Sequence, residues 1–99
     1  MPRPDPTWTL HGFEECLDAW IEREQPSEDL SYVVTEWAIS RSEDPYGGVR
    51  REPGFDNLWF GSVPLSGDGR GNAVACAYWI EEGTRTVRCD SIATLSQPI

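Results

Sequence analysis

The spacing of apolar residues changes once along this 99-residue chain, near residue 49, and this change constrains the fold more than any other feature. Residues three and four positions apart lie on one face of a helix, whereas residues two apart lie on one face of a strand. Alternation of period two marks residues 57–63, 73–81 and 85–95. Helical spacing precedes it, at Phe13, Cys16, Leu17, Trp20 and Ile21, and again at Leu30, Val33, Val34, Trp37 and Ala38.

The helical half divides into two helices at Gln25-Pro26-Ser27. Proline disfavours helical geometry at the residue before it, and Ser27 is a good N-cap for a second helix whose first turn carries acids. Residues 43–48, rich in proline and glycine, end that second helix. The short connection predicts a helical hairpin.

The strand half predicts three antiparallel strands, after a first short strand at residues 7–11. The segment 73–81 is apolar on both faces, which is typical of a central strand. A two-residue turn at Glu82-Gly83 would place Cys76 opposite Cys89 and Tyr78 opposite Val87. The sequence therefore predicts a two-layer α+β fold in the order β-α-α-β-β-β, with the helical hairpin packed on a mainly antiparallel sheet of three or four strands.

The length fits a single domain over residues 1–99. We expect a flexible tail at 1–6, a strand plus helical hairpin at 7–44, and the antiparallel sheet at 49–95. Five Trp, three Tyr and three Phe supply a sizeable core. Neither a secretory signal nor a membrane span is visible, which indicates a cytoplasmic protein and no membrane partner.

The three cysteines fit reduced thiols better than a disulfide framework, because their number is odd and no C-x-x-C pair occurs. With His11 they would formally complete a Cys₃His zinc site, but the paired short spacings of such sites are absent. We expect no metal and no cofactor.

Charge is unevenly distributed in this acidic chain, whose formal net charge is −9 and which contains no lysine. Eleven of the acids lie in residues 1–44. They alternate with apolar positions as a solvated helix face would, and such a surface also complements a basic partner. Four acids of the first helix are the candidate partner-binding residues: Glu14, Glu15, Asp18 and Glu22.

The loop 66–72 (S-G-D-G-R-G-N) lies between two strands and has neither a lysine followed by Ser/Thr nor a strand-to-helix context, so it is no P-loop. A flexible tip of a β-hairpin accounts for the glycines of this loop. A phosphate cradle is the alternative, with Arg70 supplying the charge and backbone N–H groups approaching the anion. The other arginines of this half lie near acids, so surface ion pairs compete with a phosphate-binding face.

The order of elements and several landmarks resemble the RelE/ParE superfamily of bacterial toxins from toxin–antitoxin pairs. The resemblance covers about residues 7–95. The residues that carry it are Trp37, Asp44-Pro45 with Gly47-Gly48, Pro53-Gly54 before Leu58-Trp59, Tyr78-Trp79-Ile80, and Val87 through Leu95.

The resemblance implies an antitoxin or another basic protein as partner, and RNA or the ribosome as a second candidate ligand. It also implies a ribosome-dependent, metal-independent messenger-RNA endoribonuclease, should the chain be an enzyme. Arg50 and Arg51 would then bind phosphate, and Arg70, Arg88 and Tyr78 would be catalytic.

Two other functions remain open. The lysines and the C-terminal arginine and tyrosine usual in active ribonucleases of the family are missing from this sequence. A non-catalytic acidic binding protein, such as an inhibitor or immunity-like protein that occupies a basic protein surface, is therefore the alternative. A structural subunit of a larger assembly is a third interpretation.

Overall fold

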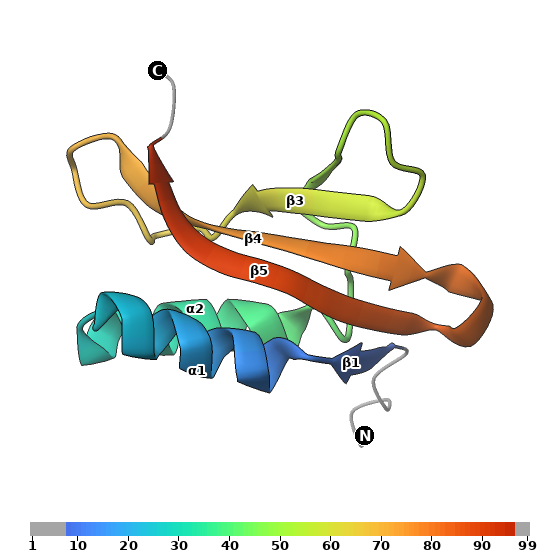
Figure 1. The fold of residues 1–99 in the computed structure, drawn as a ribbon, viewed down its shortest axis with the longest axis horizontal. Helices are drawn as coiled ribbons and strands as arrows, with labels where there is room; N and C mark the ends of the chain where they lie inside the picture. Colours follow the sequence, from blue (N-terminus) through green and yellow to red (C-terminus); the bar gives the residue numbers. More distant parts are fainter. Residues whose placement is uncertain (1–7, 97–99) are drawn as a thin grey trace, which may run out of the picture.

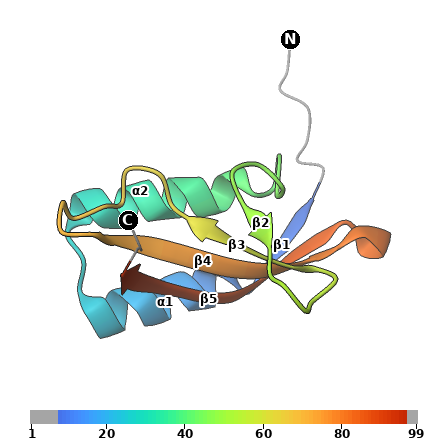
Figure 2. The ribbon, with the colours of Figure 1, turned by 90° about the horizontal axis from the view of Figure 1, so that it is seen from above.

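Two helices cover one face of a five-stranded sheet and leave the other face open (Figure 1, Figure 2). The computed structural model describes residues 8–96, so the predicted tail at 1–6 lies outside the described residues. The elements are β1 (Thr9–His11), α1 (Phe13–Glu24), α2 (Glu28–Ser40), β2 (Arg50–Arg51), β3 (Leu58–Ser62), β4 (Asn72–Glu81), a 3₁₀ turn (Glu82–Thr84) and β5 (Thr86–Ser96).

The strand order across the sheet is β1-β5-β4-β3-β2. β1 runs parallel to β5, and every other pair is antiparallel. The predicted α+β class and its two layers are confirmed. The predicted order holds apart from β2, a two-residue edge strand that adds a fifth strand and is too short to show alternation in the sequence.

The helix boundaries follow local chemistry. The Ser27 side chain accepts a hydrogen bond from the Leu30 N–H at 3.1 Å, as expected of an N-cap. α1 begins after Gly12, whose left-handed φ of 76° suits glycine, and ends at Gln25 in the same region. None of the helices within residues 8–96 is long and apolar enough to cross a membrane.

The core fills the space between the helices and the covered face of the sheet. Trp20 and Tyr78 are its largest fully buried side chains. An aromatic ring of this kind removes about 150–250 Å² from water, which is worth about 4–6 kcal/mol of transfer free energy. Val34 and Val87 pack in the same buried cluster. The buried core thus lies on the covered face of the sheet.

The predicted register between β4 and β5 is wrong by two residues next to the turn and by three residues beyond Ala77. The connection is the 3₁₀ turn with Arg85 in the left-handed region, which is longer than a two-residue turn. Tyr78 therefore lies opposite Cys89, not Val87, and Cys76 lies opposite Ile92, not Cys89. A shift of two leaves Cys89 on its predicted face.

A β-bulge then changes the faces along β5. Ala77 pairs with Ser91 and Tyr78 with Cys89, so Asp90 has no partner in the ladder. An extra residue of this kind reverses the alternation beyond it. Ile92 is buried for this reason, although strict alternation from Val87 would have placed it outside.

Candidate functional site on the open face of the sheet

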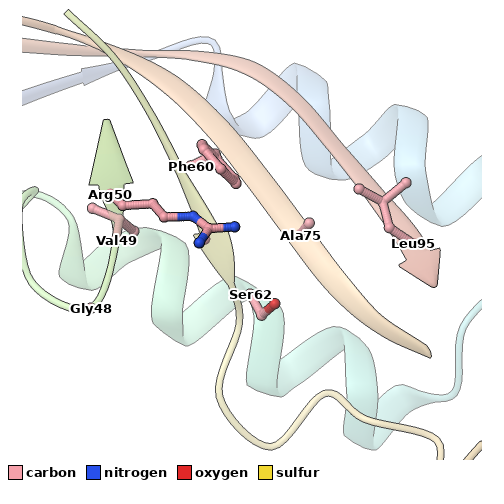
Figure 3. Close-up of a pocket in the computed structure, with 8 residues that line it drawn as sticks. Gly48, Val49, Arg50, Phe60, Ser62, Ala75 and Leu95 are labelled. Atoms are coloured by element: carbon pink, nitrogen blue, oxygen red, sulfur yellow. The ribbon is translucent and has the colours of Figure 1, made fainter. Parts of the chain in front are cut away.

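The open face of the sheet carries a hollow of about 520 Å³ (Figure 3). Successive residues of a strand point to opposite faces, so neighbours of the buried Cys76, such as Ala75, face outward. The small residues Gly61, Ser62 and Ala75 form its floor. The lining residues are Gly48, Val49, Arg50, Phe60, Gly61, Ser62, Ala75 and Leu95.

Arg50 is the one charged side chain among the described residues that line this hollow. Its guanidinium carbon lies 4.7 Å from the centre of the Phe60 ring, and the side chain extends from β2 across β3 (Figure 3). The ring attracts the cation and fixes its position. A guanidinium stays protonated and offers a planar fork of donors that matches phosphate or carboxylate. The hollow is therefore suited to an anion with an apolar neighbour.

Gly61 allows β2 to approach this place. A Cβ at residue 61 would lie 2.9 Å from Val49 Cγ1 and 3.1 Å from the Gly48 carbonyl oxygen. Gly48 itself has a φ of +75°, which favours glycine. The segment before Arg50 thus approaches β3 at Gly61 to a distance that only glycine permits there.

Arg41, on the covered side of the sheet, holds the segment that leads into β2. It is buried at the C-terminal end of α2, where a cation is favourable, and its guanidinium lies 4.2 Å from the centre of the Trp37 ring. Its Nη1 donates to the Gly47 carbonyl at 2.6 Å. Sequence reasoning missed Arg41, and its position in the last turn of the expected helix was the available signal.

The other sequence-predicted arginines do not converge on the hollow. Arg88 lies on the open face, but β5 is three strands away from β2, a distance of about 14 Å. Its guanidinium forms an ion pair with Glu81 at 3.1 Å. Arg51 pairs with Trp59 and thereby points to the opposite face of the sheet. Arg70 is exposed on the loop between β3 and β4.

Tyr78 lies inside the core, on the covered face. Its ring is fully buried, and its hydroxyl donates to the Pro45 carbonyl at 2.5 Å and accepts from Arg41 at 3.4 Å. Burial raises the pKa of this phenol, although Arg41 acts in the opposite direction. The hydroxyl holds the 45–47 segment in place, away from any substrate on the open face.

The glycine-rich loop binds its own carboxylate. Asp68 Oδ1 accepts hydrogen bonds from the Arg70 and Asn72 N–H groups at 2.7 and 3.2 Å, and Oδ2 accepts from the Asn72 side chain at 2.8 Å. The Asn72 side chain, followed by the Arg70 N–H, lowers the pKa of Asp68. Two of the N–H groups that a phosphate cradle would use are therefore occupied, and the loop has the geometry of a connector.

The cysteines are clustered where α1 packs on β4 and β5. Burial, followed by a hydrogen bond with Cys89, raises the pKa of Cys16 to about 12. The Cys76 thiol and burial raise the pKa of Cys89 as well. Protonated thiols are poor nucleophiles and poor metal ligands. Within residues 8–96, no group of three His, Cys, Asp or Glu side chains is placed to hold a metal ion.

The acids predicted to bind a partner lie on α1, on the covered side of the molecule and away from the hollow. Glu14, Glu15, Asp18 and Glu22 span slightly more than two turns of the helix. All four are exposed. The structure thus separates the two candidate surfaces: an arginine-bearing hollow on the open face and an acidic surface on the helices.

The hollow's chemistry is electrostatic. Arginine does not accept protons at physiological pH, and no His, Lys or Tyr is among the described lining residues. The described lining residues are suited to binding an anion and to stabilising negative charge, and they offer no side chain suited to proton transfer.

No protein-family model and no curated protein matches this sequence. A solved structure is similar: the E. coli toxin RelE in the free state, as a mutant with two arginines replaced by alanine. The similarity has a TM-score of 0.58 with 12% sequence identity, and it covers 87% of this chain and 81% of that chain. At this identity the likeness concerns the arrangement of elements alone. The chain therefore has a RelE-like toxin fold.

Proposed function

We propose that this chain is a RelE/ParE-like toxin-superfamily protein of a bacterial toxin–antitoxin system, and that the open face of its sheet binds RNA. In this proposal it works in the cytoplasm with a protein partner. The observation that carries the proposal is the arginine-bearing hollow on the open face of a RelE-like fold. The anion that suits this hollow is a phosphodiester, with Arg50 as its ligand.

The rest of the open face offers surfaces for bases. Phe60 and Leu95 border the hollow, and Phe55 packs edge-on against Trp79 with ring centres 5.7 Å apart. Stacking on aromatic side chains contributes about 1–3 kcal/mol per base without sequence preference. Arg88, beyond Trp79, would contact a phosphate further along the strand. Single-stranded RNA fits this combination better than a duplex.

The reaction we assign to this surface is cleavage of messenger RNA on the ribosome. The ribose 2′-hydroxyl attacks the adjacent phosphorus, the bond from phosphorus to the 5′ oxygen breaks, and the hydroxyl proton is transferred to that oxygen. Arg50 stabilises the added negative charge on the phosphate oxygens. No metal takes part in this scheme. The ribosomal complex supplies the proton-transferring group, which the described lining residues of the hollow do not offer.

Induction in a bacterial host tests the proposal. Wild-type protein should stop growth and shorten messenger RNA, and Arg50→Asn should restore growth. Arg85→Asn is the matched control: it removes the same charge from a position where the guanidinium lies 4.4 Å from the Trp8 ring centre and where a left-handed φ suits asparagine. Normal growth and intact messenger RNA with the wild-type protein would refute the toxin assignment.

A second candidate, a non-catalytic acidic binding protein, is favoured by one observation: no His, Lys or Tyr is among the residues of 8–96 that line the hollow. Such a protein would occupy a basic surface of one partner through its acidic helices. It predicts unimpaired growth on induction, tight and salt-sensitive association with that partner, and no effect of Arg50→Asn.

A further inference from the structure

The longest unpaired strand edge within residues 8–96 belongs to β5. β4 pairs with β5 along one side, whereas on the other side β1 covers only residues 86–88. The edge of residues 89–96 therefore has no strand beside it in the part of the chain that the structure describes. β1 and β2, at the two ends of the sheet, have only three and two residues. An exposed edge offers unpaired N–H and C=O groups to a strand of another chain.

The C-terminal part of this edge is the part that would pair most readily. Residues 91–96 (S-I-A-T-L-S) contain no charged residue, no proline and no glycine. Uncharged segments of about six residues with these features are typical of strands that pair with a second copy of themselves. Earlier in the strand, the charge of Arg88 and the bulge at Asp90 disfavour such pairing. The segment 91–96 has no protection of this kind.

α1 contacts this segment through two adjacent side chains at its C-terminal end. Arg23 Nη2 donates to the Ile92 carbonyl oxygen at 2.8 Å, and Glu24 Oε2 accepts from the Thr94 N–H at 3.1 Å. Figure 2 shows α1 running alongside β5. We call Arg23 and Glu24 the edge latch. They offer the donor and the acceptor that a neighbouring strand would offer to the same backbone groups.

Opposite charges hold the edge latch together. Arg23 Nη2 lies 3.7 Å from Glu24 Oε2, so each side chain helps to position the other. Burial opposes the ionisation of Glu24, but the hydrogen bonds from Thr94 outweigh it and lower the pKa of this carboxyl. Hydrogen bonds made by a guanidinium or a carboxylate are stronger than those between neutral groups. A strand that adds to this edge must therefore displace two charge-assisted contacts.

We propose that the edge latch prevents the β5 edge from pairing with the β5 edge of a second copy of this chain. Two copies would meet antiparallel across a two-fold axis at residues 91–96, as an isologous interface requires. Such pairing leaves the two-residue β2 at both ends of the joined sheet, so association stops at a dimer. The net charge of −9 on each copy adds a weaker, long-range repulsion.

The test is sedimentation velocity of the full-length protein with Arg23→Ala and Glu24→Ala combined. Alanine keeps helix propensity high and removes both contacts with the edge. The wild type should sediment as a monomer. The latch variant should form a dimer, with an association constant at least about tenfold above that of the wild type, because two hydrogen bonds no longer compete with the second copy. High salt should strengthen the dimer, since it screens the repulsion between the copies.

Glu36→Ala with Arg70→Ala is the matched control. It also removes one acid and one arginine, from exposed positions on α2 and on the loop before β4, and should behave as the wild type does. Thr94→Pro, added to the latch variant, locates the interface. The Thr94 N–H points to α1, so proline removes no hydrogen bond from the β4–β5 ladder but blocks a strand at this edge. This triple variant should be a monomer again.

Circular dichroism checks that each variant is folded. Glu24→Ala alone should give a smaller gain in association, and it takes the place of the double variant if the latter does not fold. The proposal is overturned if the folded latch variant stays monomeric, if the wild type or the control dimerises as strongly, or if Thr94→Pro leaves the dimer intact. RNA binding plays no part in these measurements, so their outcome is independent of the proposed function.

Discussion

Gly61→Ala is the substitution that most directly couples the local backbone to the proposed RNA site. The new Cβ would lie 2.9 Å from Val49 Cγ1 and 3.1 Å from the Gly48 carbonyl oxygen. Real Cβ atoms almost never approach a heavy atom to less than 3.0 Å, so the segment that leads into β2 must shift. Arg50 lies next in this segment, and it would leave its place over Phe60.

The magnitude follows from two opposing terms. Overpacking of this kind costs about 1–3 kcal/mol. Replacing glycine in a strand by alanine regains about 0.5–1 kcal/mol of conformational entropy. The net loss should be about 1 kcal/mol, which corresponds to a fall in Tm of about 4–8 °C for a domain of this size.

Urea unfolding followed by tryptophan fluorescence measures this loss, and RNA binding measured on the same samples reports on Arg50. Val49→Ala relieves the shorter contact, so it should cost less in the Gly61→Ala background than in the wild type, with a coupling energy of about 1 kcal/mol. A Gly61→Ala protein that is as stable as the wild type and binds RNA equally well would refute the role of this glycine.

Three further changes test other parts of the structure. Arg41→Met removes the hydrogen bonds to Gly47 and Tyr78 and should lower the free energy of unfolding by about 2–4 kcal/mol; a loss below about 1 kcal/mol in urea unfolding contradicts the anchoring role. Leu65 is 91% exposed with a φ of 66°, so Leu65→Asn should raise Tm by a few degrees in calorimetry, and an unchanged Tm would show that the residue is unstrained. Burial, followed by a hydrogen bond to Glu82, raises the pKa of Tyr46 to about 12 from 10.0 in an unfolded chain. Its contribution to stability is therefore present below about pH 10 and lost as the pH rises toward 12, so Tyr46→Phe should reduce the fall in Tm over this interval; equal falls would contradict the assignment.

The layers of the fold were predictable from sequence because they depend on periodicity. The helical spacing of residues 13–38 and the alternation in residues 73–81 each identify one buried face. The bulge at Asp90 was not predictable, since an extra residue in a strand leaves no composition signal. Nor was β2, because two residues are too few to show a period.

The site was only partly predictable, because residue types do not specify which face of the sheet a side chain occupies. Sequence indicates which arginines exist, but strand position determines that Arg50 enters the hollow while Arg51 points to the other face. The loop's glycines indicated an anion-binding site. The anion that the loop's N–H groups bind is the carboxylate of Asp68, which belongs to the loop itself. Such contacts depend on backbone geometry that residue types alone do not specify.

The central claim is that the open-face hollow acts on RNA through Arg50. Its most direct test is primer extension on messenger RNA bound to purified ribosomes, after incubation with wild-type protein, Arg50→Asn or the control Arg85→Asn. The account predicts new 5′ ends with the wild type and the control, and a loss of about a hundredfold or more in their rate of formation with Arg50→Asn, the scale set by removing one charge-stabilising donor. Intact messenger RNA with the wild type, or equal cleavage by all three proteins, would contradict it.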